Sequence, residues 1–156
     1  MPSVGEFRIV WHGDAVTKNV AGKLERIVKS ACEAVKAEAI RSIRDDPKTG
    51  KWYWGRSGRY YQASAASESP AVDTGSLMRS ISVLMEKEGT SITAYIGLMD
   101  PSKHDPLYKP MVSWYLEKGH YNKKAGRNIP PRPFMNPALM KVKKKIDDII
   151  SKESKI

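Results

Sequence analysis

The sequence has one cysteine and no long apolar run. Cys32 has no second cysteine with which to form an internal disulfide, and its place in a helical pattern predicts a small buried residue. No apolar stretch approaches the roughly 20 residues that span a bilayer. The N-terminal residues lack the basic start and apolar run of a secretory signal. We therefore expect a protein made in the cytoplasm.

A recognisable catalytic or metal-binding set is also missing. The three histidines, His12, His104 and His120, are scattered and do not show metal-ligand spacing. Asp100, His104 and Asp105 lie close together in a proline-rich stretch, which is a weak metal signal. We expect no metal, no cofactor and no enzymatic activity.

The composition fits one soluble domain over residues 1–156. The chain is 40% hydrophobic and 28% charged, with a net charge of +10. From residue 117 onward there are eleven basic and four acidic residues, a local net charge of +7. Such a surface attracts polyanions, but charge alone does not separate nucleic acid from an acidic protein. The candidates to face DNA or an acidic partner are Lys123, Lys124, Arg127, Lys143, Lys144 and Lys145.

Two amphipathic helices frame the chain. Over residues 15–43 apolar side chains recur every three or four positions, which predicts a long helix with Asp14 as its N-cap. We favour a stripe that covers the domain's own sheet over a seam for a partner helix. Asn136 as N-cap and Pro137 at the first helical position predict the start of a final helix.

Alternating apolar residues predict the strands. They occur at residues 7–11, and at 81–85 and 92–98, which together indicate an antiparallel hairpin. Residues 111–118 are expected to form a short helix ended by Gly119, and residues 121–128 a basic loop. The predicted fold is α+β, with a long N-terminal helix and a C-terminal helix packed on a small antiparallel sheet.

Residues 48–69 are predicted to form an aromatic and basic hairpin arm. Two aromatic runs flank a Gly-Arg-Ser-Gly turn and include Trp52, Trp54, Tyr60 and Tyr61. The aromatics could stack on the bases of single-stranded nucleic acid. They could also pack against a neighbouring subunit, where Trp, Tyr and Arg are favoured, and this is the interpretation we prefer. Residues 63–70 resemble an exposed, mobile connection.

Asp73, Thr74 and Gly75 form a turn signal. Two side-chain acceptors precede a residue that is free to adopt positive φ, so the triplet is expected to cap the turn or helix that follows. A catalytic role for Asp73 would need a partner base or nucleophile, and the sequence supplies none.

The segment of residues 130–134 is stiffened by its prolines. Phe134 is expected to fill the core beside the final helix, and Arg132 to make a functional contact. Glu117, Arg132 and Phe134 are also candidate contact residues for a neighbouring subunit or ring. Glu117 has two interpretations, which the sequence leaves open. It either pairs with Arg132, because carboxylate–guanidinium bonds are strong when partly buried, or remains solvated and unpaired.

Three motifs, in order, resemble the tail-completion (neck) proteins of long-tailed bacteriophages. The aromatic–apolar–Glu–x–Gly segment of that family is matched by residues 115–119, and its Arg-Pro-Phe-x-x-Pro-Ala signature by residues 132–138. The central motif is matched by Ala63-Ser64-Ala65, Pro70-Ala71-Val72-Asp73-Thr74-Gly75-Ser76-Leu77 and Ser80-Ile81. The similarity covers residues 16–150. Departures lie in two loops: Ala66-Ser67-Glu68 replaces Pro-Gly-Glu, and Gly119-His120 replaces Gly-Thr.

The resemblance implies a structural virion protein that acts by docking. Such proteins form a ring, expected to be a hexamer, at the head-proximal end of the tail and join it to the DNA-filled head. Implied partners are copies of itself, a tail terminator or tail tube protein, a head-closure or connector protein, and the genome DNA that passes through the ring. The alternatives are a tail terminator or head-closure ring of the same neck and, from another class, a stand-alone nucleic-acid-binding module.

Overall fold

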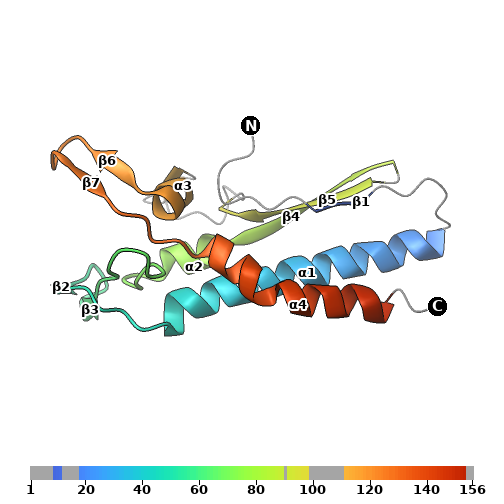
Figure 1. Cartoon of the computed structure of the whole chain (residues 1–156), viewed down its shortest axis with the longest axis horizontal. Coiled ribbons are helices and arrows are strands. Elements are labelled where there is room, and N and C mark those ends of the chain that lie inside the picture. The colour runs from blue at the N-terminus through green and yellow to red at the C-terminus, as the bar shows by residue number, and fades with distance from the viewer. Residues whose placement is uncertain (1–8, 12–17, 90, 99–110, 154–156) are drawn as a thin grey trace.

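Two long helices run side by side beneath a small sheet in the computed structural model, which describes residues 9–11, 18–89, 91–98 and 111–153 (Figure 1). Helix α1 spans Lys18–Asp45, and α4 spans Met135–Glu153. The antiparallel sheet has the order β1-β5-β4, with β1 at Ile9–Trp11, β4 at Ser82–Glu88 and β5 at Ser91–Gly97. Helix α1 contacts both α4 and the sheet. The predicted α+β class is confirmed.

The predicted apolar stripe of α1 forms the centre of the core. Its residues recur at helical spacing and therefore face one side, where they are removed from water. Most are buried, namely Leu24, Val28, Ala31, Cys32, Val35, Ala39 and Ile43. They pack with the inward residues of β5 and with Phe134, Met135, Ala138 and Val142 at the start of α4. The stripe thus covers the domain's own interior, as we favoured. Asp14 and Phe7 lie outside the described residues.

The sheet presents two different faces. In β4 the odd-numbered Val83 and Met85 pack on the core, whereas Leu84 on the opposite face is 45% exposed. This alternation follows from the strand period of two. Strand β4 pairs with β5 in the register Leu84↔Tyr95. Since β5 lies in the centre, β4 is an edge of the sheet among the described strands.

Two further hairpins lie at one end of the molecule, at the left of Figure 1. The first pairs β2 (Trp52–Trp54) with β3 (Tyr60–Gln62), as predicted, and the second pairs β6 (His120–Asn122) with β7 (Arg127–Ile129). The prediction of a basic loop at residues 121–128 is wrong, because backbone pairing shapes this segment into a hairpin.

Short helices α2 (Ser76–Ser80) and α3 (Met111–Lys118) connect the hairpins to the body. Gly119 has a φ of 72° and follows α3 directly, which confirms its predicted place as the helix terminator. None of the described helices has the length and apolar character needed to cross a membrane.

Helix α4 begins at Met135, before Pro137, which was the predicted first helical residue. Asn136 therefore lies inside its first turn and is exposed instead of serving as the N-cap. Pro137 is the third helical residue, where a backbone N–H has no partner within the helix and its loss is tolerated. Another side chain supplies the cap, as described below.

Cys32 provides a test of this packing. Its side chain is fully buried, and burial, followed by the nearby charge of Glu33, raises the pKa of its thiol to about 11. Because the thiolate is the reactive form, we expect Cys32 to resist a disulfide-exchange reagent at pH 8 and to react fully in denaturant. Rapid reaction of the native protein, followed spectroscopically, would contradict the burial.

Candidate assembly surface

The β2–β3 hairpin turns an uncovered aromatic face to the outside. Trp52, Trp54 and Tyr60 lie on this face and are 64%, 65% and 69% exposed. Trp54 stands opposite Tyr60 in the register, and their rings meet edge to face with centroids 4.9 Å apart. We call these three residues the aromatic face.

Tyr61, predicted as a fourth contact residue, lies on the other side of the hairpin. It is half-buried, and its neighbour across the strands is Tyr53, with ring centroids 6.3 Å apart. A strand sends successive side chains to opposite faces, so Tyr61 and Tyr60 do not belong to one surface. The separation follows from the register, which the sequence alone did not specify.

Asp73 anchors the tip of this hairpin instead of capping α2. Its carboxylate accepts hydrogen bonds from the backbone N–H groups of Arg56 at 3.1 Å and Ser57 at 3.2 Å. Helix α2 has no side-chain cap, so the prediction for Asp73 is wrong. A Cβ at Gly55 would collide with the Asp73 carboxylate, which explains glycine at the base of the turn. The motif therefore joins the hairpin to the body.

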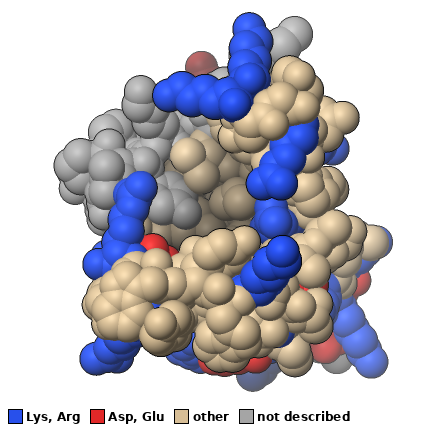
Figure 2. All heavy atoms as spheres, turned by 90° about the vertical axis from the view of Figure 1, so that its left-hand side faces the viewer, with Lys and Arg blue, Asp and Glu red and all other residues tan. Residues whose placement is uncertain are grey.

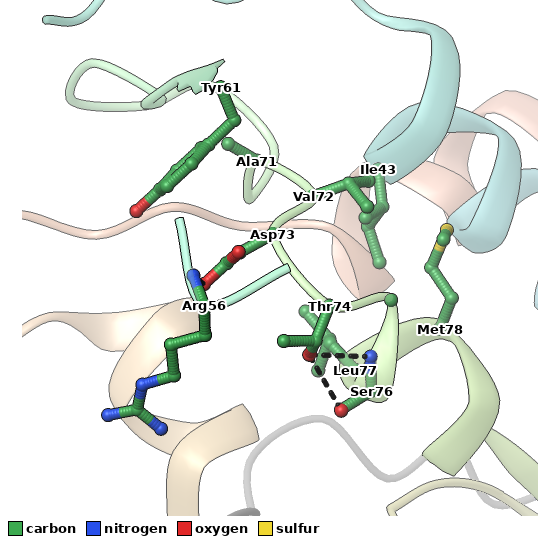
Figure 3. A pocket seen from close by; sticks show the side chains of 11 residues that line it. Ile43, Arg56, Tyr61, Ala71, Val72, Asp73, Thr74, Ser76, Leu77 and Met78 are labelled. Atoms are coloured by element: carbon green, nitrogen blue, oxygen red, sulfur yellow. Dashed lines mark hydrogen bonds between the residues drawn. The ribbon is translucent and has the colours of Figure 1, made fainter. Parts of the chain in front are cut away.

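Thr74 and Gly75 form the local turn as expected. Gly75 has a φ of 75°, and the Thr74 hydroxyl accepts from the backbone N–H of Ser76 at 3.3 Å. The hydroxyls of Thr74 and Ser76 are also within 2.7 Å of each other (Figure 3). This turn directs the chain from the hairpin base into α2.

A cleft of about 360 Å³ lies beside Asp73, between the hairpin, the end of α1 and α2 (Figure 3). Apolar side chains of Ile43, Val72, Leu77 and Met78 line it, together with Arg56. Such a lining can hold an apolar side chain of a bound partner. Arg56 can place its guanidinium near a carboxylate of that partner. The described residues that line it do not include a histidine, cysteine or lysine.

Hydrogen bonds hold residues 63–70 against the body, and the prediction of an exposed connection is correct only for Ala66 and Ser67. Ser64 and Ser69 are buried, and the Ser69 hydroxyl donates to the Ser42 carbonyl at 2.6 Å. The carboxylate of Glu68 accepts from the Thr49 N–H at 3.0 Å and the Ala65 N–H at 2.8 Å. Small polar residues looked solvated in the sequence, but here they satisfy backbone groups.

The proline-rich segment ties the bases of the two hairpins together. The Ser67 N–H donates to the Pro131 carbonyl at 2.9 Å, and Arg132 Nε donates to the Ser64 carbonyl at 3.1 Å. Arg132 was predicted to make a functional contact. Its side chain donates instead to the Ser64 carbonyl within the same chain. The two hairpins are consequently fixed on the same end of the molecule.

Glu117 supplies the missing cap of α4. The side chain is 6% exposed, and Oε1 accepts from the backbone N–H groups of Phe134 at 2.9 Å and Met135 at 2.6 Å. Neither sequence interpretation is correct, because Glu117 is neither solvated nor paired with Arg132. The two N–H groups are among those that a helix start leaves without partners. Phe134 itself is fully buried, which confirms its predicted place in the core. The same burial leaves neither Phe134 nor Glu117 exposed for the predicted contact with a neighbouring subunit.

The predicted basic contact residues fall into two groups, all exposed. Lys123, Lys124 and Arg127 lie on the β6–β7 hairpin, whereas Lys143, Lys144 and Lys145 lie on α4. Figure 2 views the hairpin end face-on; Lys and Arg side chains project from it, and little Asp or Glu surface is visible. The structure thus gathers cations around the hairpins without uniting both groups.

Polar residues that stiffen this end did not stand out in the sequence. Lys48 donates to Ser69 and to the Ser42 carbonyl, and Thr49 and Glu68 are bonded to each other. A long sequence separation hides such pairs, and no pattern signal identifies them.

Among the residues that the structure describes, no cluster of three or more His, Cys, Asp or Glu could hold a metal ion.

An Asp73→Asn substitution tests the hairpin anchor. Burial raises the pKa of Asp73, but the N–H donors of Arg56 and Ser57, the Ser57 hydroxyl and the Arg56 charge together outweigh it and hold the pKa below its usual value. Bonds that lower a carboxyl pKa stabilise the folded state when the pH is above the pKa of the unfolded chain, about 3.9. This stabilisation is lost as the pH falls through the pKa of the folded state. We expect the protection of the Arg56 and Ser57 amides against hydrogen exchange, relative to their intrinsic rates, to fall in the variant, and to fall in wild type below about pH 4.

The exposed Asp147 on α4 offers a matched control. Asp147→Asn removes the same charge and should leave exchange in the hairpin unchanged. Equal exchange at Arg56 and Ser57 in wild type and Asp73→Asn, at neutral pH, would show that the carboxylate does not hold the tip.

The comparisons with known proteins give no match. No protein-family model, no curated protein and no solved structure matches this chain.

Proposed function

We propose that this chain is a structural virion protein that forms a ring at the head-proximal end of a phage tail and joins the tail to the DNA-filled head. The observation that carries the proposal is the rigid, uncovered aromatic face of the β2–β3 hairpin. The ordered motifs that resemble tail-completion proteins give it its biological setting. In this account the protein docks and does not make or break bonds.

The aromatic face has the properties of a contact surface. Trp and Tyr are enriched among residues that dominate binding, whereas soluble monomers seldom expose contiguous apolar patches. An isolated two-stranded hairpin is only marginally stable. Here Asp73 fixes the tip, and backbone bonds of Ala63 with Gly50 and Lys51 fix the base. A surface ordered in advance loses less conformational entropy on binding.

A ring follows from contacts between two different surfaces of identical copies. Such head-to-tail contacts close into a ring when the rotation between copies permits it. Six copies, a tail terminator or tube protein on one side and a head-closure or connector protein on the other complete the proposed setting. Genome DNA passes through the opening, and the protein resides in the neck of the virion.

A tail terminator or head-closure ring would use the same surface at another level of the neck.

The basic hairpin end separately favours a nucleic-acid-binding module, because residues 118–146 contain no acidic residue. Phosphate binding weakens steeply with salt. Absence of DNA binding at low ionic strength would exclude the module.

Deletion of the gene tests the proposal. Electron microscopy of the resulting lysate should show filled heads beside separate, finished tails. Overlong tails would instead indicate a terminator, and leaking, empty heads would indicate a head-closure ring. Normal virions would exclude all three.

A further inference from the structure

We propose that the aromatic face of one copy docks on the outer face of strand β4 in the next copy, with Arg56 and Arg59 at the hairpin tip meeting Glu86 and Glu88. This inference rests on the proposed ring and names the two surfaces that close it.

The hairpin cannot reach β4 of its own chain at this place. Lys87 Nζ bonds Glu25 Oε2 at 2.5 Å, which sets the end of β4 over the early turns of α1. The β2–β3 hairpin follows the other end of α1, beyond Asp45. About 30 Å of helix separates Glu25 from Asp45 at 1.5 Å per residue. Figure 1 shows the hairpin and the end of β4 on opposite sides of the molecule. The contact must therefore be between copies.

The receptor surface combines one apolar side chain with two carboxylates. Leu84, Glu86 and Glu88 alternate along β4 and are all exposed. Lys87 projects to the other side, where it bonds Glu25, so it does not neutralise the two glutamates. Glu86 and Glu88 have no ion pair with any described residue. This face of β4 thus carries two carboxylates without an ion pair to the described part of the chain, beside an exposed leucine.

The hairpin is complementary in charge. Residues 48–67 contain Lys48, Lys51, Arg56 and Arg59 and no acidic residue. Arg56 lies within the turn and Arg59 follows it, and both are exposed. Asp73 accepts from the Arg56 N–H, and the Arg56 charge helps to lower the pKa of Asp73, but no ion pair joins either arginine to a described residue. Guanidinium groups bind carboxylates through charge-assisted hydrogen bonds.

The order of the groups along the two surfaces also agrees. On the hairpin the aromatic face is followed by the basic tip, and on β4 Leu84 is followed by Glu86 and Glu88. Leu84, Glu86 and Glu88 follow strand spacing, in which alternate side chains lie roughly 7 Å apart, and on the hairpin Arg56 and Arg59 lie between the two strands, close in the chain to Trp54 and Tyr60. Apolar contact and charge pairing can therefore form together. Because the two surfaces differ, the contact is head-to-tail, as a ring requires.

A reciprocal charge exchange tests the docking. One variant carries R56E and R59E, and the other carries E86R and E88R. Each alone should weaken self-association on the order of 100-fold, since like charges then face each other. An equimolar mixture should assemble again, because in an alternating ring each interface between two altered surfaces is followed by one between two native surfaces. Sedimentation velocity reports both results.

Matched controls change equal charge elsewhere. D147R with D148R should not affect assembly, and neither should K29E with K152E, since these exposed residues lie on α1 and α4. Circular dichroism establishes that each variant is folded, and the neutral R56Q/R59Q variant should weaken assembly to a lesser degree.

The outcomes separate this inference from the proposed function. If wild type assembles and both charge-reversed variants assemble equally well, the ring stands and this docking is overturned. If wild type remains monomeric at all concentrations and salt conditions, the ring and the docking both fail. If the R56E/R59E variant assembles normally but no longer binds a single-stranded oligonucleotide that wild type binds, the hairpin contacts nucleic acid and the docking is overturned.

Discussion

Replacing Phe134 with alanine is expected to lower the free energy of unfolding by about 3–5 kcal/mol. The ring is fully buried and packs where the start of α4 meets α1 and β5. Its removal loses apolar contact and leaves a cavity that the stiff proline segment before it cannot readily fill. Denaturant unfolding, followed by circular dichroism, measures the change.

Met140→Ala is the matched control, because Met140 lies on α4, the helix that Phe134 directly precedes, and is 71% exposed. It should change stability by less than about 0.5 kcal/mol. A loss below about 1 kcal/mol for Phe134→Ala would mean that this ring does not support the core.

Replacing Glu117 with alanine is expected to cost about 2–4 kcal/mol. The substitution leaves the backbone N–H groups of Phe134 and Met135 buried without an acceptor and removes the cap of α4. Denaturant unfolding gives the magnitude, and hydrogen exchange at these two amides gives the location. Exchange should rise there before it rises in the middle of α4.

Glu117→Gln separates the cap from the charge, since the amide oxygen can still accept from both groups. We expect it to retain much of the stability lost in the alanine variant. Glu153→Ala, an exposed change near the other end of α4, should have little effect. If Glu117→Ala unfolds like wild type, the cap does not stabilise the helix start.

Periodicity was sufficient to predict the elements that depend on a buried face. The stripe of α1 and the alternation of β4 and β5 appear in neighbouring residues, and burial of each stripe fixes which side faces the core. The β6–β7 hairpin was missed because its strands have three residues each and do not alternate in polarity. Its shape depends on contacts at its base, which sequence order does not reveal.

The sequence identified several residues of the site but not the groups to which they are hydrogen-bonded. Asp73 and Glu117 were recognised as important carboxylates, yet each accepts from backbone N–H groups 16 to 18 residues away in the chain. Backbone donors leave no mark on the sequence, since almost every residue has one. Asn136 and Pro137 predicted a helix start close to the real one, but the cap comes from Glu117 in α3.

The same limit applies to the aromatic face. Trp52, Trp54 and Tyr60 share one side because the turn sets Trp54 opposite Tyr60, and that register sends Tyr61 to the other side. Hairpin register depends on turn geometry, which a glycine-containing sequence permits in more than one form.

Complementation tests most directly whether this protein joins heads to tails through the aromatic face. Purified protein is added to a lysate of the deletion phage, and infectious particles are counted. We expect wild type to restore infectivity and a folded variant with Trp52, Trp54 and Tyr60 replaced by serine to fail. No increase in infectious particles on addition of wild type, or equal rescue by the serine variant, would contradict the account.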